Sequence, residues 1–432
     1  MNDEAPTPTR AYSLWVLALL SLAYVLNFVD RQVLAIVAVD VKRELALSDF
    51  ELSLLLGPAF VICFTLSGFV LSHLADTRSR KWVLSAGLTL WSGLTAACGA
   101  ATSFLQLALL RFGVGIGEAA GAPPSQSMLS DTFPPTQRAR ALSVFGLGIY
   151  VGTLLGFAGG GVIAQWFDWR TAFLVAGCSG IPLALAIAFT VREPARQARA
   201  AAHGAPVAEM WRLLVRQRTY RRLMAAAACQ AFIGFAALTW SAILLQRVFG
   251  MNKAAAGISF GSIAGIAGGA GSLLGGALAD RLAARDPRWY AWLSAGVSLA
   301  AAPFFAAFAQ APSAALALGC FGVFYFLNNI YVPSLWTLVQ TLVPARLRAT
   351  SSATQLAITN LFGYAVSAPV IGALNDWLAP SLGDAALRWT LLLPAAVGAL
   401  AGPLFYRCAA SVREDLAAVS AESSSNPSRA AP

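Results

Sequence analysis

The chain has 432 residues, of which 58% are hydrophobic and only 12% are charged, about half the charged share of an average soluble domain. A soluble protein of this length needs a polar exterior, which this composition cannot supply, so the sequence predicts a membrane protein. The formal net charge of +10 does not indicate nucleic-acid binding, because the basic residues lie in short connectors rather than in a patch with interleaved aromatics.

Twelve apolar stretches are long enough to cross a bilayer, which takes about 20 residues each. A long connector at 192–222 carries eight arginines and divides them into two sets of six. We therefore expect an all-α membrane protein with an N-terminal six-helix bundle at 1–191, a cytoplasmic linker at 192–222, a C-terminal bundle at 223–410 and a disordered cytoplasmic tail at 411–432. The predicted spans are 13–37, 51–74, 82–100, 104–128, 140–164, 170–191, 223–247, 256–280, 290–310, 313–337, 349–374 and 386–408.

The distribution of basic residues predicts the orientation of these spans. If both termini are cytoplasmic, the outer connectors hold only Lys42, Arg43, Arg170, Arg247, Lys253 and Arg388. Arg31 and Arg111 lie within spans, and all the other basic residues among the thirty fall in inner segments. This bias follows the positive-inside rule and indicates a multi-pass protein of a bacterial-type inner membrane.

The two halves repeat each other. Asp76 ends the second span and Asp280 ends the eighth, each followed by basic residues, and Arg138 and Arg346 open equivalent spans in the two halves. Parallel duplication of this kind is found in transporters whose two halves move relative to each other. We expect Asp76 and Arg80, with Asp280, Arg138 and Arg346, to form a cytoplasmic gate, in which Asp76 caps the span that begins near Arg346.

Four charged residues lie within the spans of the first half. They are Asp30 and Arg31 in the first span, and Arg111 and Glu118 in the fourth. Arg111 and Glu118 share one helix face about 10 Å apart, and Asp30 lies at the depth of Arg111. Such charges are tolerated when they pair or face water. Asp30 and Glu118 are therefore candidate proton carriers with Arg31 and Arg111 as ion-pair partners, and a static pair that joins the two helices is the alternative.

The second half carries neutral polar residues in its spans. We expect a substrate pocket there, with Asn27 contributed by the first half, although polar helix–helix contacts explain the same residues equally well. Such a pocket suits an amphipathic molecule with an ionic head. The expected pocket residues are Asn27, Gln230, Trp240, Tyr325, Asn328 and Asn329.

Glycine runs mark two spans. Gly257, Gly261, Gly265 and Gly269 recur every four residues, and Gly152, Gly156 and 159–161 form a second run. Close helix packing explains both runs. The second run also resembles an antiporter motif, with Phe157 where that motif has proline, so antiport is the alternative interpretation of this run.

The charged loop after Asp76 and its weaker repeat after Asp280 resemble the signature loop of the major facilitator superfamily, with Ser72 and Ser79 in place of its usual glycines. The strings Asn27-Phe28-Val29-Asp30-Arg31 and 111–119 are similar to those of the Spinster family. This resemblance implies movement of lysophospholipids or sphingoid phosphates, in some members coupled to protons.

These observations predict a secondary active transporter that works by alternating access, acts as a monomer and needs no cofactor. A proton-driven drug or organic-anion carrier is the alternative. A membrane enzyme is disfavoured because no catalytic cluster appears, and a membrane sensor because no signalling domain is appended. The six scattered cysteines lack the spacing of a metal or redox site.

Overall fold

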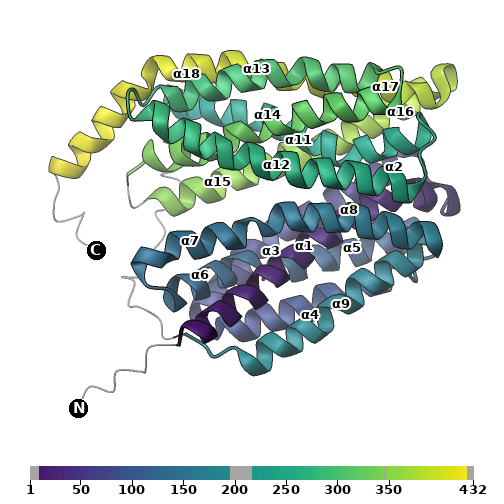
Figure 1. The fold of residues 1–432 in the computed structure, drawn as a ribbon, viewed down its shortest axis with the longest axis horizontal. Helices are drawn as coiled ribbons and strands as arrows, with labels where there is room; N and C mark the ends of the chain where they lie inside the picture. Colours follow the sequence, from purple (N-terminus) through teal and green to yellow (C-terminus); the bar gives the residue numbers. More distant parts are fainter. Residues whose placement is uncertain (1–8, 195–216, 345–346, 426–432) are drawn as a thin grey trace. The chain divides into compact units, whose positions relative to one another are not determined.

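The computed structural model describes residues 9–194, 217–344 and 347–425, and within these ranges it is helical throughout, with no strand. The chain divides into two compact units, each of which takes in a short segment from the other half of the sequence (Figure 1). Unit 1 comprises Met1–Val41, Ala59–Ala198 and Lys253–Gly261. Unit 2 comprises Lys42–Pro58, Arg199–Asn252 and Ser262–Pro432.

Unit 1 is built from eight helices in the described residues, and proline or glycine stands at most of their breaks. Pro135 begins one helix, and Pro123 lies in the first turn of another, where a missing amide costs nothing. Ser103 and Asp168 cap two others by accepting hydrogen bonds from backbone amides. The helices are α1 (Arg10–Glu44), α3 (Pro58–Thr77), α4 (Arg80–Cys98), α5 (Phe104–Glu118), α6 (Ala122–Thr132), α7 (Pro135–Gly146), α8 (Gly148–Trp166) and α9 (Trp169–Thr190).

Unit 2 contains the remaining described helices, and α12 (Lys253–Ala283) passes from unit 1 into it. Its apolar core gathers side chains from α11, α13, α14 and α18, including Tyr220, Leu335 and Phe405. The elements are α2 (Asp49–Leu56), α11 (Arg218–Arg247), α13 (Trp289–Gln310), α14 (Ala314–Thr341), α15 (Arg348–Asn360), the π-helix η2 (Leu361–Ser367), α16 (Ala368–Leu382), the 3₁₀-helix η3 (Gly383–Ala385), α17 (Ala386–Thr390) and α18 (Leu392–Ser425).

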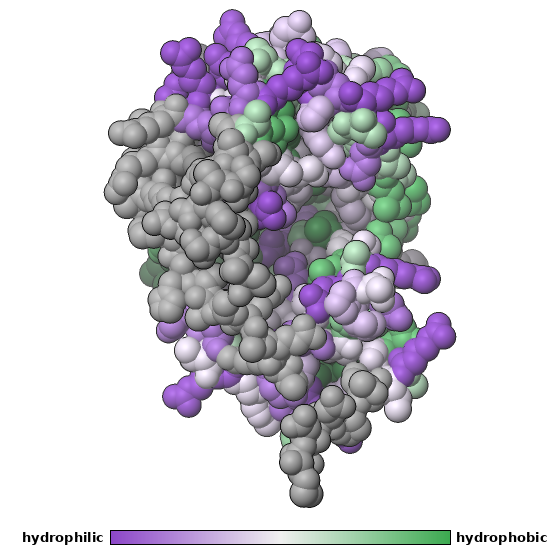
Figure 2. Space-filling view, turned by 90° about the vertical axis from the view of Figure 1, so that its left-hand side faces the viewer, coloured by the Kyte–Doolittle hydropathy of each residue, from purple (hydrophilic) through white to green (hydrophobic). Residues whose placement is uncertain are grey.

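Ten helical stretches in the described residues are long and apolar enough to cross a membrane. Hydrophilic side chains gather on the face in Figure 2, which looks onto the helix ends at the left-hand side of Figure 1. The architecture is therefore that of a multi-pass, all-helical membrane protein.

The predicted linker and tail are both shorter than expected. Residues 218–222 belong to α11, and residues 411–425 continue α18 as helix instead of forming a disordered tail. The extension is helical because it packs: Val412 is fully buried in the core of unit 2, and Leu416 lies against that core. Residues 195–216 of the predicted linker and 426–432 of the predicted tail lie outside the described residues.

The glycine run on α8 makes close helix contacts in unit 1. A Cβ atom at Gly152 would lie 2.5 Å from the carbonyl oxygen of Val25, and one at Gly161 would lie 2.4 Å from that of Lys253. A Cβ atom at Gly257 would lie 2.2 Å from the carbonyl oxygen of Phe157. These distances leave no room for a side chain, so the run lets α8 approach α1 and the start of α12 at backbone distance.

Candidate functional site

The interior of unit 1 holds a buried ion pair between α1 and α5. Arg31 Nε donates to Glu118 Oε2 at 2.8 Å, and the side chains are 12% and 0% exposed. The guanidinium of Arg31 lies 4.8 Å from the ring centre of Phe60 and 4.7 Å from that of Phe64. Aromatic faces attract a cation, so the arginine is held by one carboxylate and by ring faces at the same time.

Asp30 and Arg111 lie in the same interior, and no hydrogen bond or ion pair joins them in the described part of the chain. Asp30 instead accepts a hydrogen bond at Oδ2 from Thr95 on α4, while its Oδ1 has no hydrogen-bond partner. Arg111 is fully buried, its Nε and Nη1 have no hydrogen-bond partner, and its guanidinium lies 5.2 Å from the ring centre of Phe60. Of the two expected ion-pair partners, Arg31 pairs with Glu118, whereas Arg111 forms no ion pair in the described part of the chain.

The incomplete bonding of this interior is chemically significant. Buried charged groups without partners are costly, since their lost hydration is not replaced. Glu118 Oε1 also lacks a hydrogen-bond partner. Asp30, Arg111 and Glu118 therefore keep unused bonding capacity, and a proton or an anionic group could use it.

The expected pocket residues of unit 2 are buried, and several have unused polar atoms. Gln230 is 1% exposed, and its Nε2 has no hydrogen-bond partner. Nε1 of Trp240 and Oδ1 of Asn328 also have no hydrogen-bond partner. Asn329 differs, because its Nδ2 donates to the carbonyl oxygen of Tyr325 at 2.8 Å, one turn earlier in α14. Asn27, the expected contribution of unit 1, is buried in α1.

Further polar residues of unit 2 also have unused polar atoms and were missed by sequence reasoning, among them two serines and a glutamine. Ser241, Ser334 and Gln355 are buried, and each has a side-chain oxygen without a hydrogen-bond partner. A glutamine within the predicted span 349–374 was the available signal for Gln355. Serines in spans commonly bond to their own helix backbone, so sequence offered no signal for the other two.

The expected cytoplasmic gate residues lie at helix ends. Arg80 is buried and bonds within unit 1: it donates to Asp131 and, at 2.8 Å, to Oε1 of Glu193. Asp76 is exposed at the end of α3, and Arg138 is half-buried in α7. Asp280 accepts a hydrogen bond from the hydroxyl of Tyr290 at 3.3 Å. Arg346 lies outside the described residues, so the gate remains a prediction.

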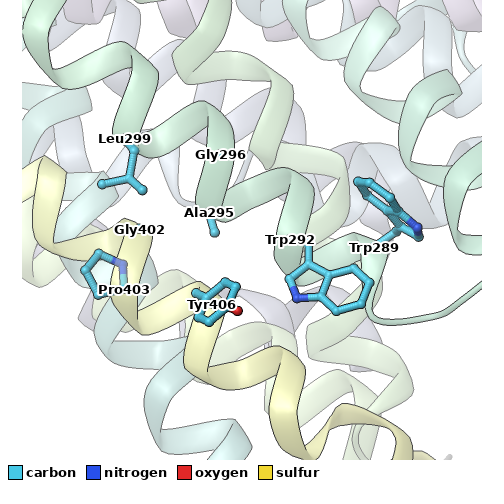
Figure 3. A pocket seen from close by; sticks show the side chains of 8 residues that line it. All are labelled: Trp289, Trp292, Ala295, Gly296, Leu299, Gly402, Pro403 and Tyr406. Carbon is cyan, nitrogen blue, oxygen red and sulfur yellow. The ribbon is translucent and has the colours of Figure 1, made fainter.

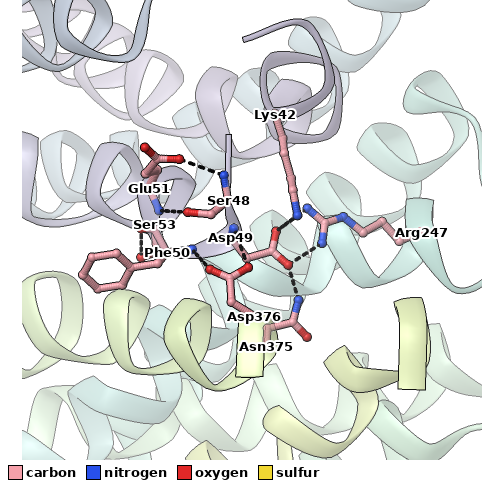
Figure 4. A network of polar contacts seen from close by, with 9 residues as sticks. All are labelled: Lys42, Ser48, Asp49, Phe50, Glu51, Ser53, Arg247, Asn375 and Asp376. Carbon is pink, nitrogen blue, oxygen red and sulfur yellow. Dashed lines mark hydrogen bonds and ion pairs between the residues drawn. The ribbon is translucent and has the colours of Figure 1, made fainter. Parts of the chain in front are cut away.

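A polar cluster that sequence reasoning missed surrounds Asp49 in unit 2 (Figure 4). Its carboxylate is 2% exposed and receives Lys42 Nζ at 2.6 Å and both Nη atoms of Arg247 at 2.7 and 2.9 Å. Asn375 donates to the same carboxylate. The carboxylate of Asp376 in turn accepts the backbone amides of Asp49 and Phe50 at 2.9 and 2.8 Å, at the start of α2. The cluster therefore ties the end of α1 and the start of α2 to α11 and α16.

Comparison with known proteins shows the family. The sequence model of the Major Facilitator Superfamily matches residues 20–368. The chain is 33% identical over 399 residues to an MFS-type efflux pump of Mycolicibacterium smegmatis, covering 92% of each protein. It is 28% identical to protein spinster homolog 1 of Mus musculus, covering 94% of this chain and 82% of that one.

A solved structure gives the same result at the level of the fold. The chain superposes with a TM-score of 0.87 and 27% identity on a bacterial homolog of the human lysosomal transporter Spinster in an inward-facing, unoccupied conformation. That match covers 94% of this chain and 99% of the other. The chain therefore belongs to the Major Facilitator Superfamily of transporters, and within it the chain is Spinster-like.

Proposed function

We propose that the protein is a proton-coupled secondary transporter that works by alternating access and moves an amphipathic, lipid-like anion, of the lysophospholipid or sphingoid-phosphate type, across the membrane. One observation carries the proposal: a buried interior that holds a complete ion pair, Arg31–Glu118, together with Asp30 and Arg111, whose bonding is incomplete. A static pair that only joins α1 to α5 would need neither of the latter two residues.

The chemistry of this interior suits proton exchange. A buried carboxylate is favoured in its neutral form by loss of water and in its charged form by a nearby cation. Asp30 and Glu118 each keep one oxygen without a hydrogen-bond partner, and that oxygen is where a proton would bind. We propose that each acid releases its proton when an arginine approaches and takes one up when the arginine moves away.

The neutral polar residues of unit 2 are the proposed substrate contacts. Gln230, Trp240 and Asn328 each present a polar atom without a hydrogen-bond partner, and amide and indole groups bind a polar head without changing charge. We propose Asn27, Tyr325 and Asn329 as further contacts. The lipid-like substrate also rests on the similarity to Spinster proteins.

The alternative substrate class is a drug or small organic anion. It is supported by the name of the mycobacterial relative, an MFS-type efflux pump. Both substrate classes use the same proton chemistry, so the assignment of Asp30 does not depend on the choice between them.

We further propose twelve spans with both termini cytoplasmic, in a bacterial-type inner membrane. The ten apolar stretches omit α4, and they include one stretch of 68 residues, Thr350–Ala417, which is too long for a single crossing. Adding α4 gives an eleventh span. Splitting the long stretch into two crossings, at the point between α16 and α18, gives a twelfth. The division into halves at 192–222, the monomeric state and the gate formed by Asp76, Arg80, Arg138, Asp280 and Arg346 also belong to the proposal.

The decisive experiment is transport in proteoliposomes under an imposed pH gradient, with a lysophospholipid and an organic-anion dye as alternative cargoes. Asp30→Asn fixes the neutral form, and we expect it to abolish gradient-driven accumulation while the variant still exchanges cargo across the membrane without a gradient. The matched control is Asp384→Asn, an exposed position in η3. Equal dependence on the gradient in wild type and Asp30→Asn would return the four charges to the static-pair interpretation.

A further inference from the structure

An apolar groove runs along the surface of unit 2, between α13 and α18 (Figure 3). Its volume is about 430 Å³, within the range of sites that hold small molecules. One wall comes from α13, with Trp289, Trp292 and Leu299, and the other from α18, with Pro403 and Tyr406. None of these groups is charged, so the groove suits a hydrocarbon chain.

The floor of the groove is kept open by glycine. A Cβ atom at Gly296 would meet nothing within 4 Å, so the missing side chain leaves free space. Gly402 has the opposite environment, because Leu299 leans over it and a Cβ atom there would lie 2.3 Å from Leu299 Cγ. Tyr406 is 66% exposed and Leu299 is 50% exposed, so the groove opens to the surroundings of the protein.

Basic residues lie at one end of this groove. Arg288 precedes α13, and its guanidinium lies 4.9 Å from the ring centre of Trp292. Asp286 accepts from Arg288 Nε at 3.1 Å and from Arg413 Nη2 at 2.8 Å. Arg413 lies seven residues after Tyr406 and therefore shares its face of α18. Two arginines with one carboxylate leave a net positive charge beside the two tryptophans, which pack edge to face at 5.5 Å.

We propose that the groove binds one anionic phospholipid of the surrounding bilayer, distinct from the transported molecule. One acyl chain lies along α13 past Gly296, and the phosphate lies at Arg288 and Arg413. Tryptophan and tyrosine are the residues that prefer the level of lipid head groups, which fits their place next to the arginines. Basic residues at that level attract anionic lipids, which selects an anionic lipid over a zwitterionic one.

The test fills the groove and counts bound lipid by native mass spectrometry of the purified full-length protein. The probes are phosphatidylglycerol and phosphatidylcholine with identical acyl chains. Gly296→Leu places a side chain in free space, and its matched control is Gly319→Leu, at an exposed glycine of α14 that also has nothing within 4 Å of its Cβ position. We expect Gly296→Leu to lower affinity for phosphatidylglycerol about tenfold, and the control to match wild type.

A second variant tests the role of the two arginines and leaves Gly296 unchanged. Arg288→Gln with Arg413→Gln should lower affinity for phosphatidylglycerol about fivefold per arginine and leave that for phosphatidylcholine unchanged. Equal binding of the two lipids by wild type, or phosphatidylglycerol binding that survives Gly296→Leu, would overturn the proposal. A dimer that Gly296→Leu dissociates would overturn it as well, because the groove would then be an interface between copies of the chain.

Discussion

The interiors of the two units differ in the kind of polar group that they bury. Among the buried charged residues that the structure describes, Asp30, Arg80, Arg111 and Glu118 lie in unit 1, and only Asp49 lies in unit 2, at the first residue of α2. The other buried polar side chains of unit 2 are neutral, such as Gln230 and Asn328. A carboxylate changes charge when it binds a proton, whereas an amide does not titrate. This contrast supports the proposal that the proton-linked residues lie in unit 1 and the substrate contacts in unit 2.

The largest expected effect comes from breaking the ion pair of unit 1. Arg31→Met leaves Glu118 as a buried carboxylate with no hydrogen-bonded cation, and removing one partner of a buried pair costs about 3–5 kcal/mol. The double variant with Glu118→Met should recover most of that stability, because apolar residues of similar volume replace both charges. Denaturant unfolding in mixed micelles measures both effects.

Transport separates coupling from packing in the same variants. We expect the double variant to be folded and still unable to accumulate cargo along a pH gradient. A double variant that transports like wild type would show that the Arg31–Glu118 pair only holds α1 and α5 together.

The next effect concerns Asp49, the buried charge that the structure describes in unit 2. Asp49→Ala removes the carboxylate that holds Lys42 and Arg247, and we expect a loss of about 3 kcal/mol, at the lower end because Lys42 is partly exposed. The control is Glu51→Gln, which keeps the capping box with Ser48, since glutamine serves there as well as glutamate. Equal melting temperatures of Asp49→Ala and wild type would show that water replaces the carboxylate without cost.

A smaller stability effect is expected from the neutral interior of unit 2. Gln230→Leu removes a buried amide nitrogen that has no hydrogen-bond partner, so we expect a change in stability below about 1 kcal/mol. Cargo affinity should fall about tenfold if that amide binds the polar head. Unfolding and cargo titration on one preparation check both parts, and unchanged affinity would remove Gln230 from the pocket.

The sequence predicted the helices well and their pairings less well. The helix Trp169–Thr190 lies within one residue of the predicted span 170–191 at each end. The agreement is close because the length of an apolar stretch determines where a helix can cross the membrane. The partner of Arg31 depends on the rotation of α1 about its axis, which the sequence does not specify. The Asp49 cluster joins residues 198 and 326 positions apart, and the only local signal was the capping box at Ser48.

The last stability effect is comparably small and concerns a helix end of unit 1, where a carboxylate bonds to the start of α4. Glu193 lies beyond α9 and accepts Ser79 Oγ at 2.6 Å, Arg80 Nε at 2.8 Å and the backbone amide of Lys81 at 3.1 Å. Burial alone would raise the pKa of Glu193, but these hydrogen bonds outweigh it and hold the pKa below its ordinary value. A carboxylate with a lowered pKa in the folded state stabilises the fold above its ordinary pKa, and that stability is lost as the pH falls through the folded value.

Glu193→Gln should therefore cost about 1 kcal/mol at neutral pH, and the difference from wild type should vanish as the pH falls below the folded pKa. Melting temperatures measured from neutral pH to about pH 3 follow this convergence. Glu414→Gln, at an exposed position of α18, is the control and should follow the wild-type curve throughout. A constant offset between Glu193→Gln and wild type at every pH would mean that the side chain stabilises the fold by its shape rather than by its charge. Glu193 would then contribute nothing to the loss of stability at low pH.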